Sequence, residues 1–369
     1  MIKSWEYTKE YNFLKKSIIK NLDKTLKKGK LFFGEELTKF EKNFLNKNNS
    51  KYGVAVGSGT DAIYLSLKAL NIGYNDEVIT VANTAIPTAS AIVNTGASIK
   101  FADIGQDYLI DSDKLEKLIT RKTKAIIVVH LYGQSCNMDK ILTIAKKNKI
   151  YLIEDCAQAQ GAKFKNKKVG NFGIFGCFSF YPTKILGSYG DGGFITTNNK
   201  KLFEKIKRLR FYGIETHDKS KSKYDKYFAI ENGTNSRLSE IQATILNIKI
   251  KYLSSFITKR RKIARIYDKK ITNKHVVKPI VNKNNFHVYH LYVLASKKRE
   301  QIMDLMKKND IKLTIQYPFP LHKMTAYKKF KKLNLKNTEK FSKEIFSLPI
   351  YPNLEINKIK KIINIINTV

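Results

Sequence analysis

The sequence predicts an α/β protein, with a mostly parallel β-sheet covered on both faces and a smaller α+β domain after it. Two observations support this prediction. From about residue 51, short apolar runs alternate with segments of helical periodicity, which is typical of parallel strands joined by helices. After about residue 250 this regular alternation ends. The chain has 369 residues, of which 43% are hydrophobic, so it can form more than one compact domain.

The expected elements follow one another in a regular order. The strand-like runs are YGVAVG, DEVITVA, IKFADI, TKAIIVVHLYG, IYLIEDCA, GCFSFYP and GGFITTN. The helical segments between them include DAIYLSLKALNI, IPTASAIVNTGA and MDKILTIAKKNK. A long helical stretch is expected near 236–253, followed by HVYHLYVLA, a helix, IKLTIQY and two closing helices. We therefore expect an N-terminal helical segment (1–30) that joins the small domain, a large domain (31–250) and a small C-terminal domain (251–369).

Composition excludes several classes of protein. No apolar run approaches the roughly 20 residues of a membrane span. The first 20 residues contain no continuous apolar stretch, so we expect no secretory signal and no membrane partner. The three cysteines form no C-x-x-C pair, so we expect them to be buried, without disulfides or a metal site. A reducing cytoplasm fits this pattern.

The net charge of +38 favours an anionic partner, which nucleic acid or a phosphorylated substrate would satisfy. The lysines, however, are spread over the whole chain beside abundant Asn and Ile, as expected of a general compositional bias. No C2H2, RNP or helix-turn-helix signature is present. We therefore expect no specific nucleic-acid partner, and an electrostatic field that attracts a phosphorylated substrate.

Three features of the sequence suggest one site. The apolar run YLIED ends in Glu154 and Asp155, where α/β folds bind ligands, although a structural salt bridge explains these carboxylates as well. GSGTDA lies between a strand and a helix and is either a phosphate cradle or a tight turn. Lys184 lies beside glycines in a loop between two strand-like runs, and Ser179 precedes it. A phosphate cradle, a strand-end carboxylate and a loop lysine are what pyridoxal phosphate requires.

The motifs GSGTDA, EDCAQAQGA, FSFYPTK, GDGG and GTNSRLSEIQA, in this order, resemble those of the DegT-type family of pyridoxal-phosphate aminotransferases acting on nucleotide-linked keto-sugars. The resemblance extends from FFGEELTKFEKNF through SLPIYP, which is most of the chain. It implies the type I aminotransferase fold, with a mixed, mostly parallel seven-stranded sheet in the large domain and a small C-terminal domain. It also implies a homodimer with shared active sites.

The resemblance also implies roles for individual residues. Lys184 looks like the lysine that forms the Schiff base with the cofactor, and Asp155 like the partner of the pyridine nitrogen. Gln158 matches a residue near the phenolic oxygen of the ring. Asn235 matches a phosphate ligand that reaches in from the neighbouring subunit. Three further residues match contacts to the cofactor phosphate: Gly59, Thr60 and Ser179.

Two positions depart from the family pattern. Gln160 stands where the family usually has histidine. Ala85, in NTAIPT, stands where an aromatic side chain often stacks on the cofactor ring, so the stack is either absent or supplied elsewhere.

Several residues have both a substrate-binding and a structural interpretation. Tyr181 either touches the sugar or packs in the core, and Arg237 pairs either with Glu240 or with substrate phosphates. His322 lies in a segment that matches the family's substrate region, although proline-rich packing explains it equally well. His130 either lines the site or makes local hydrogen bonds, and His217 lies in a polar loop expected near the dimer partner.

Taken with the resemblance, these features predict transfer of an amino group from L-glutamate to a nucleoside-diphosphate keto-sugar. A related dehydratase branch has histidine in place of the lysine, so Lys184 favours transamination. GTNSRLSEIQA resembles the motif of family members that aminate carbon 3 more than that of members that aminate carbon 4. This resemblance implies a dTDP-3-keto-6-deoxyhexose substrate and a 3-amino product, as in lipopolysaccharide O-antigen biosynthesis. The alternatives are 4-amination of a UDP-, dTDP- or GDP-sugar and a regulatory protein that binds pyridoxal phosphate without turnover.

Overall fold

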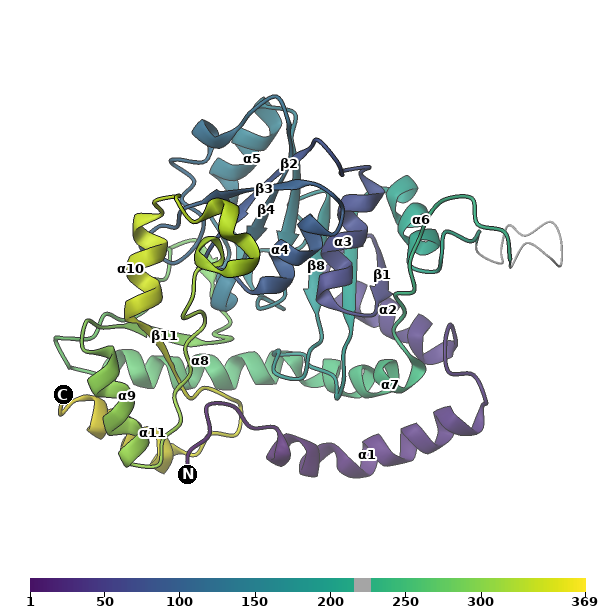
Figure 1. Cartoon of the computed structure of the whole chain (residues 1–369). Coiled ribbons are helices and arrows are strands. Elements are labelled where there is room, and N and C mark those ends of the chain that lie inside the picture. The colour runs from purple at the N-terminus through teal and green to yellow at the C-terminus, as the bar shows by residue number, and fades with distance from the viewer. Residues whose placement is uncertain (216–226) are drawn as a thin grey trace.

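The computed structural model describes residues 1–215 and 227–369. It is built around a seven-stranded sheet, which lies in the centre of the molecule (Figure 1). The strand order in this sheet is β1-β9-β8-β5-β4-β2-β3. Strands β2, β3, β4, β5 and β8 run parallel to one another, while β9 pairs antiparallel with both β1 and β8. The bounds of these strands are β1 Tyr52–Val56, β2 Glu77–Val81, β3 Ser98–Ala102, β4 Thr123–Val129, β5 Tyr151–Asp155, β8 Phe175–Ser179 and β9 Gly193–Thr197.

The central strands are apolar because helices cover both faces of the sheet. In β4, the sequence TKAIIVV is buried at every position except Lys124. Such a continuous apolar run is expected where neither face of a parallel strand meets water. The carboxyl ends of β2, β4, β5 and β8 therefore lie along one edge of the sheet, and Asp155 is the last residue of β5.

Helices α3, α4 and α6 pack on one face of the large sheet, and α2 and α7 pack on the other face. Helix α6 shows how the sequence achieves this: its apolar residues Ile206 and Leu209 are buried, while its lysines lie on the opposite side. The helix bounds are α1 Thr8–Lys27, α2 Glu35–Asn48, α3 Gly59–Ala69, α4 Ile86–Val93, α5 Met138–Lys147, α6 Lys200–Leu209, α7 Glu240–Lys249, α8 Leu253–Lys270, α9 Arg299–Lys308, α10 Lys336–Glu344 and α11 Ile356–Ile366.

The C-terminal third of the chain has an apolar core of its own. Helices α8, α9 and α11 surround the antiparallel pair β11 (Tyr292–Ala295) and β12 (Ile345–Leu348). A small three-stranded sheet, in the order β10-β6-β7, joins residue 285 to the hairpin after β5. Its strands are β6 Lys163–Phe164, β7 Lys167–Lys168 and β10 Asn285–Phe286.

The N-terminal segment contacts both parts of the molecule. Ile2 pairs with Ile311 and belongs to the C-terminal core. Helix α1 instead lies along α7, where Leu14 and Ile18 pack against Ile245 and Ile248, as Figure 1 shows along the lower edge of the molecule. The division at residues 30 and 250 stays a proposal, and α1 itself packs on the part assigned to the large domain.

The α/β class and the mostly parallel seven-stranded sheet expected from the sequence are confirmed. HVYHLYVLA contributes only the four residues of β11 to a strand, and IKLTIQY forms only isolated bridges, at Ile311 and Thr314. The strand β12 was not expected between the closing helices. The three cysteines are buried, as predicted, and are free in the structure. Among the described residues, no helix is both long and apolar enough to cross a membrane.

Candidate active site

Lys184 lies in the loop that joins β8 to β9, at the carboxyl edge of the sheet. The backbone N–H of Lys184 donates to the carbonyl oxygen of Tyr181 at 2.9 Å, so the lysine follows a tight turn. Burial lowers the pKa of its ammonium group, and the nearby carboxylate of Asp155 opposes this shift. A lowered pKa increases the fraction of the neutral amine, which is the nucleophilic form.

Asp155 is 5% exposed and is held by two hydrogen bonds. Its Oδ2 accepts from the hydroxyl of Thr88 at 2.8 Å, and its Oδ1 accepts from the N–H of Ala157 at 3.1 Å. Burial raises the pKa of the carboxyl group, while these two donors and Lys184 lower it. A buried carboxylate with these partners is oriented to hold a proton on a basic ring nitrogen.

A phosphate cradle is formed where α3 begins. Ser58 caps the helix by accepting from the N–H of Asp61 at 3.0 Å, and the N–H groups of Gly59 and Thr60 have no acceptor within the first turn. A Cβ on Gly59 would lie 2.7 Å from the Cβ of Ser179, so only glycine allows the two segments to approach this closely. The three residues predicted to contact phosphate are therefore gathered at one point.

Gln158 joins two segments on the other side of the site. Its Oε1 accepts from the N–H of Tyr132 at 2.8 Å, and its Nε2 donates to the hydroxyl of Tyr317 at 3.0 Å. The hydroxyl of Tyr132 donates to the carbonyl oxygen of Gln316. This network joins the loops after β4 and β5 to the C-terminal part of the chain. It also brings the Tyr317 hydroxyl near enough to Asp155 for the charge of this carboxylate to raise the pKa of the tyrosine.

The residues considered for substrate binding have different surroundings. Tyr181 is 51% exposed beside the lysine loop, so the core-packing interpretation of this residue was wrong. The guanidinium of Arg237 lies over the rings of Phe32 and Phe211, at 4.4 and 5.4 Å from their centres. The proposed pairing of Arg237 with Glu240 is also wrong, because the Glu240 carboxylate accepts from three backbone N–H groups at the start of α2.

The histidines considered from the sequence have structural partners where they are described. His322 is fully buried, and its Nε2 lies 3.0 Å from Glu339. His130 is fully buried as well: its Nε2 contacts Glu154 at 3.0 Å, and its Nδ1 accepts from the N–H of Cys136. These contacts favour local hydrogen bonding for His130. His217 lies outside the described residues.

Asn235 is exposed, whereas the next residue is anchored to its own chain. Ser236 donates to Asp61 at 2.7 Å and accepts from the N–H of Gly57 at 2.9 Å. The GTNSR segment therefore lies beside the phosphate cradle and presents Asn235 to the outside.

Three polar residues at the site were not predicted from the sequence: Thr88, Tyr132 and Tyr317. Thr88 lies in NTAIPT, directly after a strand end, and a hydroxyl at that position was the available signal. The two tyrosines come from segments distant in sequence, so only the fold brings them together. Ala85 precedes α4 as its N-cap residue, and its methyl group cannot stack on a ring as an aromatic side chain does.

The arrangement fits pyridoxal phosphate. A lysine of lowered pKa, a carboxylate held at a strand end and a helix N-terminus with a serine beside it match the aldehyde, the ring nitrogen and the phosphate of this cofactor. When bound, the cofactor supplies an electron sink and a carbon that exchanges amino groups. In such a site, Lys184 would hold the aldehyde carbon and move a proton, and Asp155 would keep the ring nitrogen protonated.

Comparison with known proteins identifies the family. Residues 12–367 match the model of the DegT/DnrJ/EryC1/StrS aminotransferase family. The chain is 41% identical to dTDP-3-amino-3,6-dideoxy-alpha-D-galactopyranose transaminase of Aneurinibacillus thermoaerophilus, over 95% of each chain. It is 38% identical to dTDP-3-amino-3,4,6-trideoxy-alpha-D-glucose transaminase of Micromonospora megalomicea, over 95% of this chain and 94% of that protein. A pleiotropic regulatory protein of Geobacillus stearothermophilus is also 38% identical, over 95% and 93%.

Comparison with solved structures supports the same family assignment. DesV of S. venezuelae, determined in complex with a ketimine intermediate, superposes with a TM-score of 0.93 at 32% identity, covering 98% of this chain and 96% of that one. NtdA of Bacillus subtilis with the bound cofactor PMP gives a TM-score of 0.89 at 31% identity, covering 96% and 81%. The protein is therefore a pyridoxal-phosphate-dependent sugar aminotransferase, and it belongs to the DegT/DnrJ/EryC1/StrS family.

Proposed function

We propose that the protein transfers the amino group of L-glutamate to carbon 3 of a dTDP-linked 3-keto-6-deoxyhexose. The observation that supports this most directly is the 41% identity, over 95% of the chain, to a dTDP-3-amino-sugar transaminase. A second relative at 38% identity also acts on a dTDP-3-amino sugar. The product would be a building block for a surface glycan such as the O-antigen of lipopolysaccharide.

The site supports a reaction in which two dissimilar substrates use the same lysine in turn. The neutral form of Lys184, favoured by burial, is suited to accept and return a proton at the reacting carbon. Tyr181 is exposed beside the same loop, which supports a contact with the sugar. Arg237 lies near the cradle, one residue after Ser236, and its guanidinium would pair with the substrate diphosphate.

We also propose a homodimer with shared active sites. The exposed Asn235 lies beside apolar side chains that are unusually exposed for their size: Phe32, Phe33, Tyr212, Phe228 and Ile230 are between 36% and 68% accessible. A bridge between Phe211 and Asn235 places part of this apolar surface next to GTNSR. A second copy of the chain covering this surface would bring Asn235 to the phosphate cradle of its partner.

Two other functions remain distinct candidates. Amination at carbon 4 of a UDP-, dTDP- or GDP-sugar would use the same lysine and cofactor. A regulatory role is favoured only by the name of the 38% identical Geobacillus stearothermophilus protein.

The test is to incubate the holoenzyme with L-glutamate and a panel of keto-sugar nucleotides, and to locate the new amino group by NMR. The panel contains 3-keto and 4-keto sugars on dTDP, UDP and GDP. We expect 2-oxoglutarate and a dTDP-3-amino sugar. A 4-amino product would overturn the position of amination, and a cofactor spectrum unchanged by glutamate would favour the regulatory candidate.

A further inference from the structure

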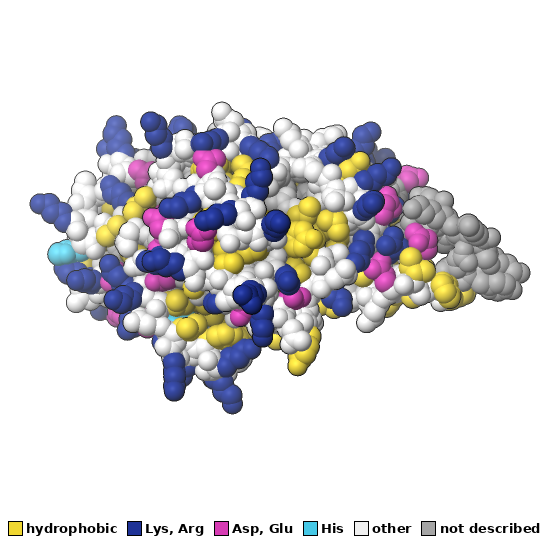
Figure 2. All heavy atoms as spheres, turned by 90° about the horizontal axis from the view of Figure 1, so that it is seen from above, with side chains coloured by type: hydrophobic (Ala, Val, Ile, Leu, Met, Phe, Trp, Pro, Cys, Tyr) yellow, Lys and Arg dark blue, Asp and Glu magenta, His cyan; other side chains and the backbone are white. Residues whose placement is uncertain are grey.

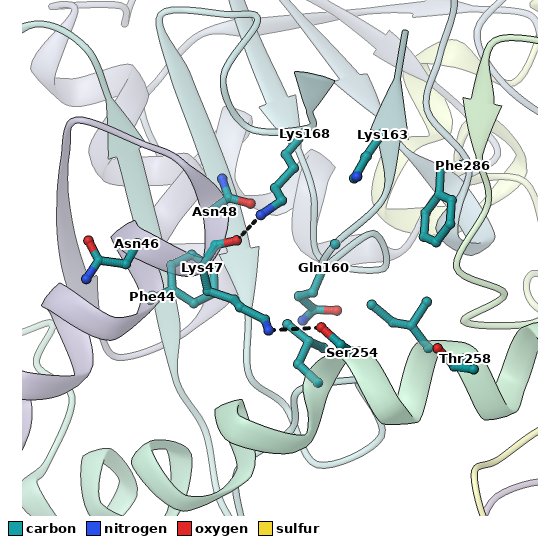
Figure 3. Close-up of a pocket in the computed structure, with 13 residues that line it drawn as sticks. Phe44, Asn46, Lys47, Asn48, Gln160, Lys163, Lys168, Ser254, Thr258 and Phe286 are labelled. Atoms are coloured by element: carbon teal, nitrogen blue, oxygen red, sulfur yellow. Dashed lines mark hydrogen bonds between the residues drawn. The ribbon is translucent and has the colours of Figure 1, made fainter. Parts of the chain in front are cut away.

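A cavity of about 300 Å³ lies on the α2 side of the large sheet, away from the residues of the cofactor site except through Gln160. Its walls come from the end of α2, the β6–β7 hairpin and the start of α8 (Figure 3). Its lining residues are Phe44, Asn46, Lys47, Asn48, Gln160, Gly161, Lys163, Lys168, Leu253, Ser254, Ile257, Thr258 and Phe286. The volume is within the range of sites for small ligands.

Three lysines surround this cavity, and none of its thirteen lining residues carries a carboxylate. Lys47 enters from α2 and donates to the hydroxyl of Ser254 at 2.9 Å, while Lys168 enters from the hairpin and donates to the carbonyl oxygen of Lys47. Burial lowers the pKa of Lys168, and the charges of Lys163 and Lys47 lower it further. Each ammonium has three N–H donors, so donors remain for a ligand.

Two lysines close to the cavity in sequence or space are paired with carboxylates instead. Lys165, in the same hairpin, pairs with Asp139, and Lys140 pairs with Asp113. Figure 2 shows lysines and arginines spread over the visible face, several of them beside acidic side chains. Among the described residues, no ion pair is formed by the three lysines of the cavity. Their mutual repulsion is therefore uncompensated, and an anion would relieve it.

The side-chain oxygen of Gln160 in the cavity lacks a hydrogen-bond donor, and an anion without hydroxyl groups would not supply one. Gln160 is 1% exposed, and its Nε2 donates to the carbonyl oxygen of Ser179 at 2.6 Å. This contact fixes the amide orientation, and it leaves Oε1 buried with no hydrogen-bond partner in the structure. Figure 3 shows the Gln160 amide in the middle of the cavity, with Ser254 and Thr258 on the α8 side. A buried acceptor without a donor is unfavourable, so a hydroxyl group of a ligand would stabilise it.

We propose that this cavity binds a small phosphorylated polyol, such as a sugar phosphate. Its phosphate would contact Lys47, Lys163 and Lys168, and one of its hydroxyl groups would donate to Gln160 Oε1. The ring of Phe286, over which Lys163 lies at 5.6 Å, provides an apolar wall for the carbon skeleton. This cavity is separate from the site of the proposed transamination. The hydrogen bond from Gln160 to Ser179 connects the cavity to the cofactor phosphate cradle.

The experiment measures binding of glucose 1-phosphate, inorganic phosphate and glucose to the holoenzyme by isothermal titration calorimetry. The test variant combines Lys163→Met with Lys168→Met. The matched control combines Lys165→Met with Lys167→Met, which removes the same charge from the same hairpin but leaves the cavity lining intact. Melting temperature and the absorbance of the bound cofactor establish that each variant is folded.

We expect wild type and control to bind glucose 1-phosphate equally, and to bind it more tightly than inorganic phosphate or glucose. The test variant should bind at least about tenfold more weakly, because two charge-assisted contacts to the phosphate are lost. Unchanged affinity in a folded test variant would place the ligand at the active site and overturn the proposal. Equal weakening of binding in the control variant would attribute binding to net charge and would also overturn the proposal. Absence of binding to the wild-type protein at millimolar ligand concentration would refute the proposal as well.

Discussion

Lys184 and Lys249 both have an ammonium pKa lowered by desolvation, and their partners distinguish them. Lys249 is 2% exposed and pairs with Glu10 at 2.7 Å, so its charge is neutralised by a structural contact. The ammonium of Lys184 is near enough to Asp155 for the charge of this carboxylate to raise its pKa, and no ion pair between the two side chains is formed in the described structure. Burial lowers the pKa of both side chains, so burial alone does not define the reactive lysine.

The first prediction concerns Lys184. Lys184→Ala should lower turnover by about 10⁴-fold or more, because both the covalent attachment of the cofactor and the proton transfer are lost. Borohydride reduction of the wild-type holoenzyme, followed by peptide mass spectrometry, should find the cofactor on the peptide containing Lys184. Lys249 is the internal control and should stay unlabelled; label on any other lysine would contradict the assignment.

The second prediction concerns Thr88, whose hydroxyl lowers the pKa of Asp155. Asp155 must be ionised to hold a proton on the ring nitrogen, so activity falls when the pH drops below its pKa. Thr88→Val removes a donor to this charge, worth about 1.5–3 kcal/mol. The acidic limb of the kcat/KM profile should therefore move to higher pH by about one to two units. Thr88→Ser keeps the hydroxyl and should keep the wild-type profile; a profile unmoved in Thr88→Val would show that Thr88 is only structural.

The sequence predicted individual site residues where a single local pattern indicated their chemical role. Asp155 was found because it ends an apolar run, and Lys184 because it lies in a glycine-rich loop between two strands. Gln158 was assigned by resemblance alone, and its contacts to Tyr132 and Tyr317 depend on three distant segments meeting. No local pattern encodes such a meeting.

At the scale of elements, Glu240 joins two helices that are far apart in sequence. Its carboxylate, at the start of α7, accepts from the N–H groups of Gly34, Glu36 and Leu37 at the start of α2. Glu240 is 2% exposed, and α2 has no side-chain N-cap of its own. A residue of one helix therefore caps another helix, and this contact joins α2 to α7.

The third prediction follows from this cap. Glu240→Gln replaces the charged acceptor by a neutral amide and should lower the free energy of unfolding by about 1.5–3 kcal/mol. The measurement is a urea titration followed by circular dichroism, with the melting temperature as a second readout. Glu35→Gln, at an exposed position in the first turn of α2, serves as the control and should change stability little. Equal stability of Glu240→Gln and wild type would show that the cap is dispensable.

The sequence predicted elements where burial was continuous or periodic. All seven strands of the large sheet were expected, because apolar runs of five to seven residues lie between helical segments. The strands of the C-terminal part were predicted less accurately from the sequence. There IFSL forms β12 because it pairs with β11, although it directly follows a helix. IKLTIQY has the alternating pattern of a strand, but it forms only two isolated bridges, one with Ile2 and one with Ser347. Pairing partners, not local propensity, decided both cases.

At the scale of the whole molecule, the fourth prediction concerns the proposed dimer. Lys184→Ala and Asn235→Ala subunits should each be inactive alone, and mixing them under verified exchange should restore part of the activity. One site of the mixed dimer would then combine an intact lysine from one chain with an intact asparagine from the other. The measurement is transaminase activity against the fraction of mixed dimer found by native mass spectrometry. Lack of recovery in verified mixed dimers would show that each site is built from one chain.

The last prediction concerns the net charge of +38, which is a property of the whole surface. Figure 2 shows that the lysines and arginines are distributed over the visible face and are not gathered in one stripe. Such a field attracts a diphosphate substrate from a distance, and it acts on the rate of encounter more than on the chemical step. Ions screen it beyond roughly 8 Å at physiological salt.

Raising the salt concentration should therefore lower kcat/KM for the sugar nucleotide modestly, while kcat changes little. The control is kcat/KM for L-glutamate, which carries less negative charge than a nucleoside diphosphate and should respond less. Duplex DNA should bind weakly, without sequence preference and with a steep dependence on salt, because its binding would rest on released counterions. A tight, sequence-specific DNA complex at physiological salt would contradict this account, since a dispersed field without base-reading contacts cannot discriminate between sequences.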